Sequence, residues 1–189
     1  MKKQSPVLRS VIIITILAIS VGIGFIYNSV WHRIDLKLYP REYSSLVEKY
    51  SEEYAVPEYI IYAVIRSESN FESGHVGDDG GIGLMGINED DFMAMTEQTR
   101  ERLTVDALYG PETNIKYGTY QLAAYYNMLE SWYGALSAKQ AGKTAAAEWA
   151  SDRSNYTDDG IFETVPDKDA AKYGKELYEC AEKYFELYY

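Results

Sequence analysis

The stretch AVIRSESNFESGHVGDDGGIGLMGIN, residues 63–88, is the most informative part of the chain, because a helical pattern in it ends on a carboxylate and a glycine-rich segment follows at once. The residues that share one helical face at this spacing are Ile61, Val64, Ile65 and Glu68. We expect this helix to begin at Pro57, since proline suits a first helical turn. The pattern therefore predicts a half-buried acid that faces a cleft.

An acid in this position has the chemistry of a proton donor. Loss of hydration disfavours the charged form of a carboxylate, so Glu68 would hold a proton near neutral pH and could pass it to a substrate. The alternative is a glutamate at a helix end that turns into solvent or pairs with Arg66. The spacing alone leaves both interpretations open.

Six glycines fall within the thirteen residues 74–86 that follow the acid. Glycine allows a positive φ and a close approach of the backbone, and this density argues against a regular helix or strand. The segment matches neither the dinucleotide-binding GxGxxG after a strand nor the phosphate-binding GxxxxGK[ST]. On composition alone it is a flexible surface loop.

Four short motifs in order carry a resemblance to a known family. Glu68-Ser69 resembles the catalytic Glu-Ser pair of the lytic transglycosylases with a soluble-type catalytic domain, relatives of goose-type lysozyme that cleave peptidoglycan. Residues 80–85, GGIGLM, resemble the family's GAxGLM at the same separation. The later pieces are residues 111–118, PETNIKYG, similar to PExNIxxG, and residues 163–166, ETVP, with the downstream Tyr173, similar to ETxP and its tyrosine.

The resemblance covers about residues 39–189 and implies a mainly α, lysozyme-like domain of the α+β lysozyme superfamily. It implies that Glu68 protonates the oxygen between N-acetylmuramic acid and N-acetylglucosamine and then, as a carboxylate, takes a proton from the muramyl C6 hydroxyl. That hydroxyl attacks C1 and forms a 1,6-anhydro ring, so the reaction requires neither cofactor nor metal. The implied substrate-binding residues are Ser69, Gly83, Leu84, Met85, Gly86, Glu148 and Tyr173. Among them Ser69 would orient Glu68, and Met85 would supply apolar contact to the sugar.

The chain departs from the family pattern at two positions. The family usually has glutamine after GLM, whereas this chain has Gly86, which removes one amide that could hydrogen-bond the sugar. The family's Ala-Tyr-Asn motif is expected near Ala147, where the chain reads Ala-Glu-Trp, so that Glu148 stands in the place of the tyrosine. Glu148 could supply a second carboxylate, or it could lie on the surface of an amphipathic helix.

Two other functions stay open at this point. Glycosidases normally use two carboxylates, and Asp78, Asp79 or Glu148 could supply the second one for a muramidase that hydrolyses the same bond with water. The departures at Gly86 and Glu148 are also compatible with a membrane-tethered module that binds glycan without cleaving it.

The N-terminal segment predicts a membrane anchor. Residues 11–31 form an uncharged, strongly apolar run of about the length that crosses a 30 Å hydrocarbon core. The basic residues Lys2, Lys3 and Arg9 precede it and favour a cytoplasmic N-terminus at residues 1–10. We therefore expect a single-pass protein of the cell membrane, with a linker at residues 32–40 and an extracytoplasmic domain at residues 41–189. A cleaved signal peptide is the alternative.

The charge of the chain narrows the choice of partners. The formal net charge is −11, and removal of the three basic residues before position 32 leaves 15 Lys and Arg against 29 Asp and Glu. A domain this acidic is a poor candidate for binding nucleic acid through phosphate contacts. The expected partners are glycan strands and, through the N-terminal helix, the membrane.

The rest of the chain also indicates helices. Stripes of apolar and tyrosine residues at helical spacing predict helices around residues 43–54, 115–133 and 173–188. An alanine-rich run predicts a short helix at residues 142–149, and the Asn, Asp, Gly and Pro content of residues 151–167 predicts a loop.

Overall fold

The computed structural model describes residues 15, 19, 20, 22 and 30–189 and divides the chain into two compact units, residues 1–40 and 41–189. The predicted anchor at residues 11–31 lies mostly outside the described residues. Among those that are described, no helix is both long enough and apolar enough to cross a membrane. All of the motifs quoted above belong to the second unit.

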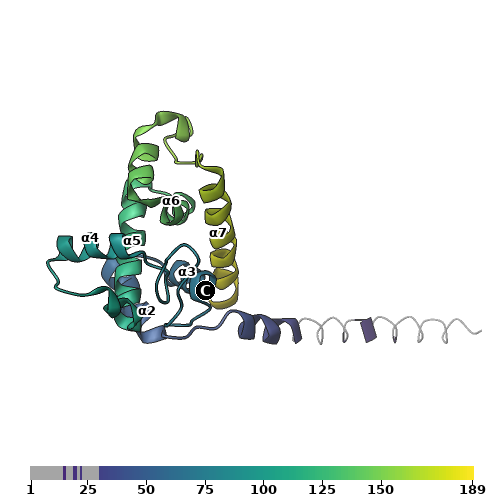
Figure 1. Ribbon diagram of the computed structural model, residues 1–189. Coiled ribbons are helices and arrows are strands. Elements are labelled where there is room, and N and C mark those ends of the chain that lie inside the picture. Colours follow the sequence, from purple (N-terminus) through teal and green to yellow (C-terminus); the bar gives the residue numbers. More distant parts are fainter. Residues whose placement is uncertain (1–14, 16–18, 21, 23–29) are drawn as a thin grey trace, which may run out of the picture. The chain divides into compact units, whose positions relative to one another are not determined.

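Helices build this second unit (Figure 1). In chain order they are α2 (Ser44–Tyr54), α3 (Glu58–Ser69), α4 (Glu89–Thr99), the 3-10 helix η1 (Val105–Tyr109), α5 (Pro111–Leu129), α6 (Trp132–Ser151), the 3-10 helix η2 (Arg153–Asn155) and α7 (Lys168–Tyr188). Extended backbone pairs only at isolated antiparallel bridges in the part described, namely Val76–Ile82, Ile82–Ile87 and Tyr156–Phe162. The prediction of a mainly α domain is confirmed.

Two predicted helices have different bounds in the structure. The stripe predicted over residues 115–133 crosses a turn, because α5 ends at Leu129 and Glu130 adopts a left-handed conformation with φ 50°. Ser131 then caps α6, its side chain accepting a hydrogen bond from the Gly134 N–H at 3.2 Å. The short helix predicted at residues 142–149 is the second half of α6, which is kinked at Gly142, where φ is 86°.

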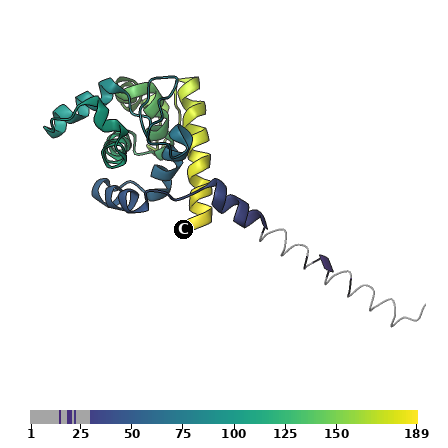
Figure 2. The same cartoon turned by 60° about the horizontal axis from the view of Figure 1, so that its bottom comes forward.

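Helix α3 lies at the centre of this unit. Its residues from Ile60 to Ile65 are all fully buried, as expected of a helix that has neighbours on every side. It packs against α2 and α7, while α6 packs against both α5 and α7 (Figures 1 and 2). The last turn of α3, which carries Glu68, therefore ends inside the domain.

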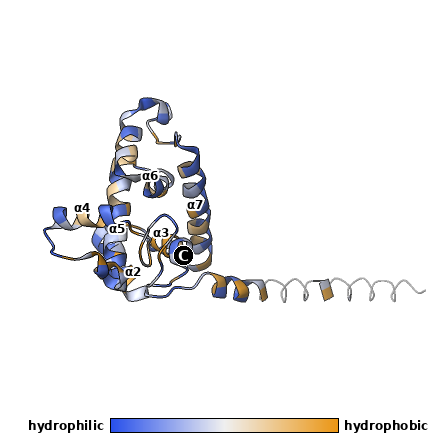
Figure 3. Cartoon of the chain, in the orientation of Figure 1, coloured by the Kyte–Doolittle hydropathy of each residue, from blue (hydrophilic) through white to orange (hydrophobic). Residues whose placement is uncertain are grey.

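Helix α7 is amphipathic and contacts α6 very closely. Hydrophilic and hydrophobic residues alternate along it (Figure 3), and its N-terminus is capped by Asp167, whose carboxylate accepts from the N–H groups of Asp169 and Ala170 at 2.9 Å each. A Cβ added at Gly174 would overlap the Ser137 hydroxyl and lie 2.8 Å from the Ser137 nitrogen. This close approach brings the neighbouring Tyr173 toward α6.

Candidate active site

The carboxylate of Glu68 lies where α3, α6 and α7 meet. Its Oε1 accepts a hydrogen bond from the hydroxyl of Tyr173 on α7, 105 residues away in the chain. The ammonium nitrogen of Lys139 on α6 lies 3.4 Å from the same oxygen. Only 12 % of the Glu68 side chain is exposed, so the acid does not turn into solvent. The structure thus brings together the two predicted residues Glu68 and Tyr173, and adds a third that was not predicted.

Tyr173 is a persistent hydrogen-bond donor to the acid. Burial raises the pKa of its hydroxyl, and the negative charges of Glu68 and Asp79 raise it further. The phenol therefore keeps its proton across the physiological range. The influence of Asp79 also shows that this exposed carboxylate, on the glycine-rich segment, lies within electrostatic reach of Tyr173.

Lys139 is the site residue that the sequence reasoning missed. Its side chain is only 6 % exposed, and its ammonium donates a hydrogen bond to the carbonyl oxygen of Gly86 at 3.0 Å. The signal that could have indicated Lys139 is its position in the chain. It follows the buried Ala135 and Ala138 and precedes the kink at Gly142. A charge in such a run of small, buried residues indicates a paired, internal group.

The predicted position of Glu148 in the cleft is wrong. Glu148 is exposed near the end of α6, and the next residue, Trp149, is buried in a core cluster with Phe162. Lys139 is the α6 residue that follows an alanine and reaches the acid. Ala138-Lys139-Gln140 therefore occupies the place beside the acid that was expected for Ala-Tyr-Asn, and it lies nine residues earlier in the chain than predicted. Glu148 is therefore the surface residue of the alternative interpretation.

Gly86 lies directly against the acid. It adopts a left-handed conformation with φ 57°, and a Cβ added there would overlap Oε2 of Glu68 and lie 2.9 Å from its Cδ. The carboxylate therefore occupies the space that the first atom of any side chain at position 86 would need. The absence of a glutamine side chain at position 86 removes an amide, and it also leaves the space that the Glu68 carboxylate occupies.

Three predicted substrate-binding residues are structural instead. The Ser69 hydroxyl lies 3.0 Å from the Ile65 carbonyl oxygen and 2.9 Å from that of Leu84, and it is buried. The side chains of Leu84 and Met85 are fully buried, so Met85 does not offer apolar contact to a sugar. Ser69 ties the end of α3 to the glycine-rich segment rather than orienting Glu68.

Asn114 holds that segment in place from α5. Its amide nitrogen donates to the carbonyl oxygens of Ile82 and Leu108 at 2.8 Å each, and its amide oxygen accepts from the Met85 N–H at 2.7 Å. Gly83, with φ 76°, packs so closely on Asn114 that an added Cβ would overlap the amide nitrogen. The whole run from residue 81 to residue 87 is buried, which corrects the prediction of a flexible surface loop.

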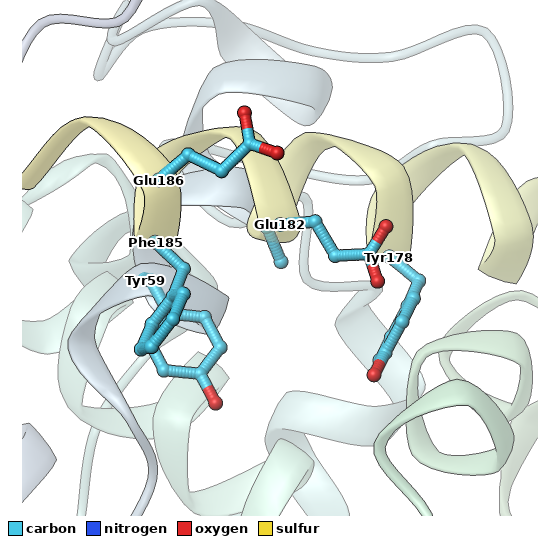
Figure 4. A pocket seen from close by; sticks show the side chains of 6 residues that line it. Tyr59, Tyr178, Glu182, Phe185 and Glu186 are labelled. Atoms are coloured by element: carbon cyan, nitrogen blue, oxygen red, sulfur yellow. The ribbon is translucent and has the colours of Figure 1, made fainter. Parts of the chain in front are cut away.

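Two hollows in the described part of the domain differ in their relation to the acid. A cavity of about 310 Å³ adjoins the site, because Tyr173 and Gln140 line it. An aromatic hollow of about 400 Å³ has Tyr59 and Phe185 on one side and Tyr178 on the other (Figure 4). Tyr59 precedes Glu68 by nine residues on α3, two and a half helical turns, so it points to the opposite side of that helix. The aromatic hollow is thus separate from the acid site.

Comparisons with known proteins agree with this architecture. The sequence profile of the transglycosylase SLT domain matches residues 45–162, more than half of the chain. No curated protein matches the chain in a sequence search.

Solved lytic transglycosylases share the fold. An inactive mutant of Slt from Pseudomonas aeruginosa is 21 % identical with a TM-score of 0.66, and the match covers 78 % of this chain and 24 % of that one. The 70-kDa soluble lytic transglycosylase of Escherichia coli is 21 % identical with a TM-score of 0.69, over 87 % of this chain and 29 % of that one. A complex of a 70-kDa soluble lytic transglycosylase with bulgecin A is 20 % identical with the same TM-score and coverage. The chain spans less than a third of the length of each, and the likeness confirms the lysozyme-like fold.

Proposed function

Because the chain belongs to the transglycosylase SLT domain family, we propose that residues 41–189 form a peptidoglycan lytic transglycosylase with Glu68 as its acid and base. The observation that carries this proposal is the carboxylate of Glu68, which is held at the end of a buried helix by the hydroxyl of Tyr173. The Pseudomonas enzyme offers a parallel, since its inactive form replaces a glutamate by glutamine.

The reaction needs one proton that leaves Glu68 and returns to it. As the bond from C1 of N-acetylmuramic acid to the bridging oxygen breaks, the Glu68 proton passes to that oxygen and completes the hydroxyl of the departing N-acetylglucosamine. The muramyl C6 oxygen then bonds to C1, and its proton passes to the Glu68 carboxylate. No water is consumed, and Glu68 ends in its starting state.

Tyr173 would fix the acid during both proton transfers. Its hydroxyl donates to Oε1 of Glu68 and stays protonated, so it restricts the rotation of the carboxyl group without competing for the transferred proton. The cavity beside Tyr173 and Gln140 is the space in which we place part of the glycan strand. Neither transfer calls for a cofactor.

Hydrolysis is the second candidate, and Asp79 is the observation that favours it. This carboxylate is exposed and lies close enough to raise the pKa of Tyr173, which touches the acid. A muramidase would use such a second carboxylate to activate water. Glu148 no longer supports this alternative, because it lies on the surface of α6.

The membrane anchor belongs to the same proposal. Residues 11–31 carry no charged side chain, and three basic residues precede them with no acidic one. This arrangement supports a single-pass anchor with the domain outside the cytoplasm, where peptidoglycan lies. Protease added to intact spheroplasts should digest the domain, and protection of the domain in intact spheroplasts would contradict the orientation.

The products of peptidoglycan digestion test the enzymatic proposal. The full-length chain and its Glu68→Gln variant are incubated with purified peptidoglycan, and the released ends are identified by mass spectrometry. We expect 1,6-anhydro ends, lighter by one water than reducing ends, from the unmodified chain and none from the variant. Reducing ends would establish the muramidase, and glycan binding without cleavage would establish a binding module.

A further inference from the structure

Lys139 combines three properties that the proposed reaction leaves unexplained. Its side chain is 6 % exposed, its ammonium lies 3.4 Å from the Glu68 carboxylate, and it donates to the Gly86 carbonyl. At this position the chain places a positive charge directly beside the acid. A buried charge of this kind is costly unless it is paired.

We propose that Lys139 is the positioning residue of Glu68, and that its ammonium, anchored on the Gly86 carbonyl oxygen, holds the carboxylate in the place from which Glu68 donates its proton. The proposal rests on the proposed function of Glu68. Lys139 acts through the carboxylate and is not assigned a contact with the glycan.

The geometry makes Lys139 and Gly86 a matched pair. The ammonium bridges the Gly86 carbonyl oxygen and Oε1 of Glu68, while the Cα of Gly86 packs against the other carboxylate oxygen, Oε2. A glutamine at position 86 would displace the carboxylate from this place. Lys139 and Gly86 therefore act on the same group, one by supplying charge and the other by supplying room.

Two groups hold the same carboxylate oxygen from different helices. Lys139 from α6 lies 3.4 Å from Oε1 of Glu68, and the hydroxyl of Tyr173 from α7 donates to the same atom. The Gly86 carbonyl oxygen fixes the Lys139 ammonium in turn, so removal of Lys139 frees one side of the acid.

The first test is the kinetics of peptidoglycan cleavage. A displacement of about 1 Å at a reacting group can lower a rate by about 10²-fold. Lys139→Met should therefore lower kcat by about 10-fold or more and leave KM within about threefold. Lys139→Arg keeps a cation within reach of Glu68 and should recover most of kcat. An unchanged kcat in Lys139→Met would overturn the proposal.

The control for net charge is Lys175→Met. Lys175 lies on the outer side of α7, where its exposed side chain faces Glu179 at 3.8 Å. This variant loses the same charge as Lys139→Met at a distant surface position. Its kcat and KM should equal those of the unmodified chain, and an equal fall of kcat in both variants would show that the effect is not specific to Lys139.

The second test does not depend on turnover. Thermal midpoints are measured for the full-length chain with Glu68→Gln, with Lys139→Met and with both. Each single change leaves a buried partner of the ion pair uncompensated, so the double variant should lose at least about 5 °C less than the sum of the single losses. If Lys139→Met folds only together with Glu68→Gln, the pairing is upheld.

The outcomes separate this inference from the function on which it rests. Additive thermal losses, or unfolding of both Lys139→Met and the double variant, would overturn the assignment of Lys139. Non-additive losses in a chain that cleaves no glycan would overturn the proposed function and leave Lys139 as the partner of Glu68.

Discussion

Replacement of Gly86 by alanine should remove most of the activity while the domain stays folded. The added Cβ would overlap Oε2 of Glu68 and lie 2.9 Å from Cδ, so one of the two groups must move. The carboxylate is the end of a flexible side chain, and it moves more easily than the buried backbone around it. We expect Glu68 to rotate away from Tyr173 and Lys139, and the rate of cleavage to fall by about 10²-fold or more, as a displacement of about 1 Å at a reacting group can cause.

The backbone contributes one part of the loss of stability. Gly86 has φ 57°, and a left-handed conformation costs a residue with a Cβ about 1–2 kcal/mol. For a domain of this size each kcal/mol lowers the thermal midpoint by about 2–4 °C, so this part amounts to about 2–8 °C. The displaced carboxylate adds a second part, because it leaves the buried Lys139 without its partner.

Gly160→Ala is the matched control for this prediction. Gly160 also has a positive φ, 80°, but no atom lies within 4 Å of an added Cβ. It should lose only the backbone part of the thermal midpoint, and it should keep its cleavage rate at a temperature where both variants are folded. Activity of Gly86→Ala equal to that of Gly160→Ala would refute the placement of the Glu68 carboxylate against Gly86.

Three further substitutions test separate parts of the site. Tyr173→Phe removes the donor to Glu68, so kcat should fall by about 10-fold or more while circular dichroism stays that of the unmodified chain; an unchanged kcat would contradict the positioning of the acid by Tyr173. Asn114→Ala leaves three buried backbone groups without their partner, and chemical denaturation should show a loss of at least about 3 kcal/mol; a loss under about 1 kcal/mol would mean that Asn114 does not hold the segment. Ser69→Ala should lower stability by about 1–3 kcal/mol and leave kcat within about threefold, whereas a large fall in kcat alone would restore Ser69 to the orientation of Glu68.

Local patterns in the sequence were sufficient for the burial of Glu68 and for most helices. The apolar spacing that ends on Glu68 needs only the geometry of one helix, and the structure has that helix at Glu58–Ser69. The boundary between α5 and α6 was missed, because the stripe continues through a turn that depends on the left-handed conformation of Glu130.

The residues around the acid could not be predicted in the same way. Lys139 on α6 and Tyr173 on α7 meet at the Glu68 carboxylate. They do so because the two helices approach closely at Ser137 and Gly174, which lie 37 residues apart in the chain. The expected position at Glu148 lies nine residues further along α6, which is half a turn out of phase even before the kink at Gly142. A small error in the placement of a motif thus exchanged a buried cation for an exposed anion.

The buried motif residues show a second limit of sequence reasoning. Met85 and Ser69 belong to segments that resemble the family's motifs, and this suggested contact with the sugar. The structure shows that they serve the packing of the glycine-rich segment against α3 and α5. Spacing along the chain does not distinguish a residue that touches substrate from one that holds its neighbour.

Digestion of peptidoglycan in ¹⁸O-labelled water distinguishes a reaction in which Glu68 serves as acid and base from one in which water is a reactant. We expect anhydro ends that carry no label, from the unmodified chain and not from Glu68→Gln. New muramic acid ends that carry ¹⁸O would show that water attacks C1, and would contradict this role of Glu68.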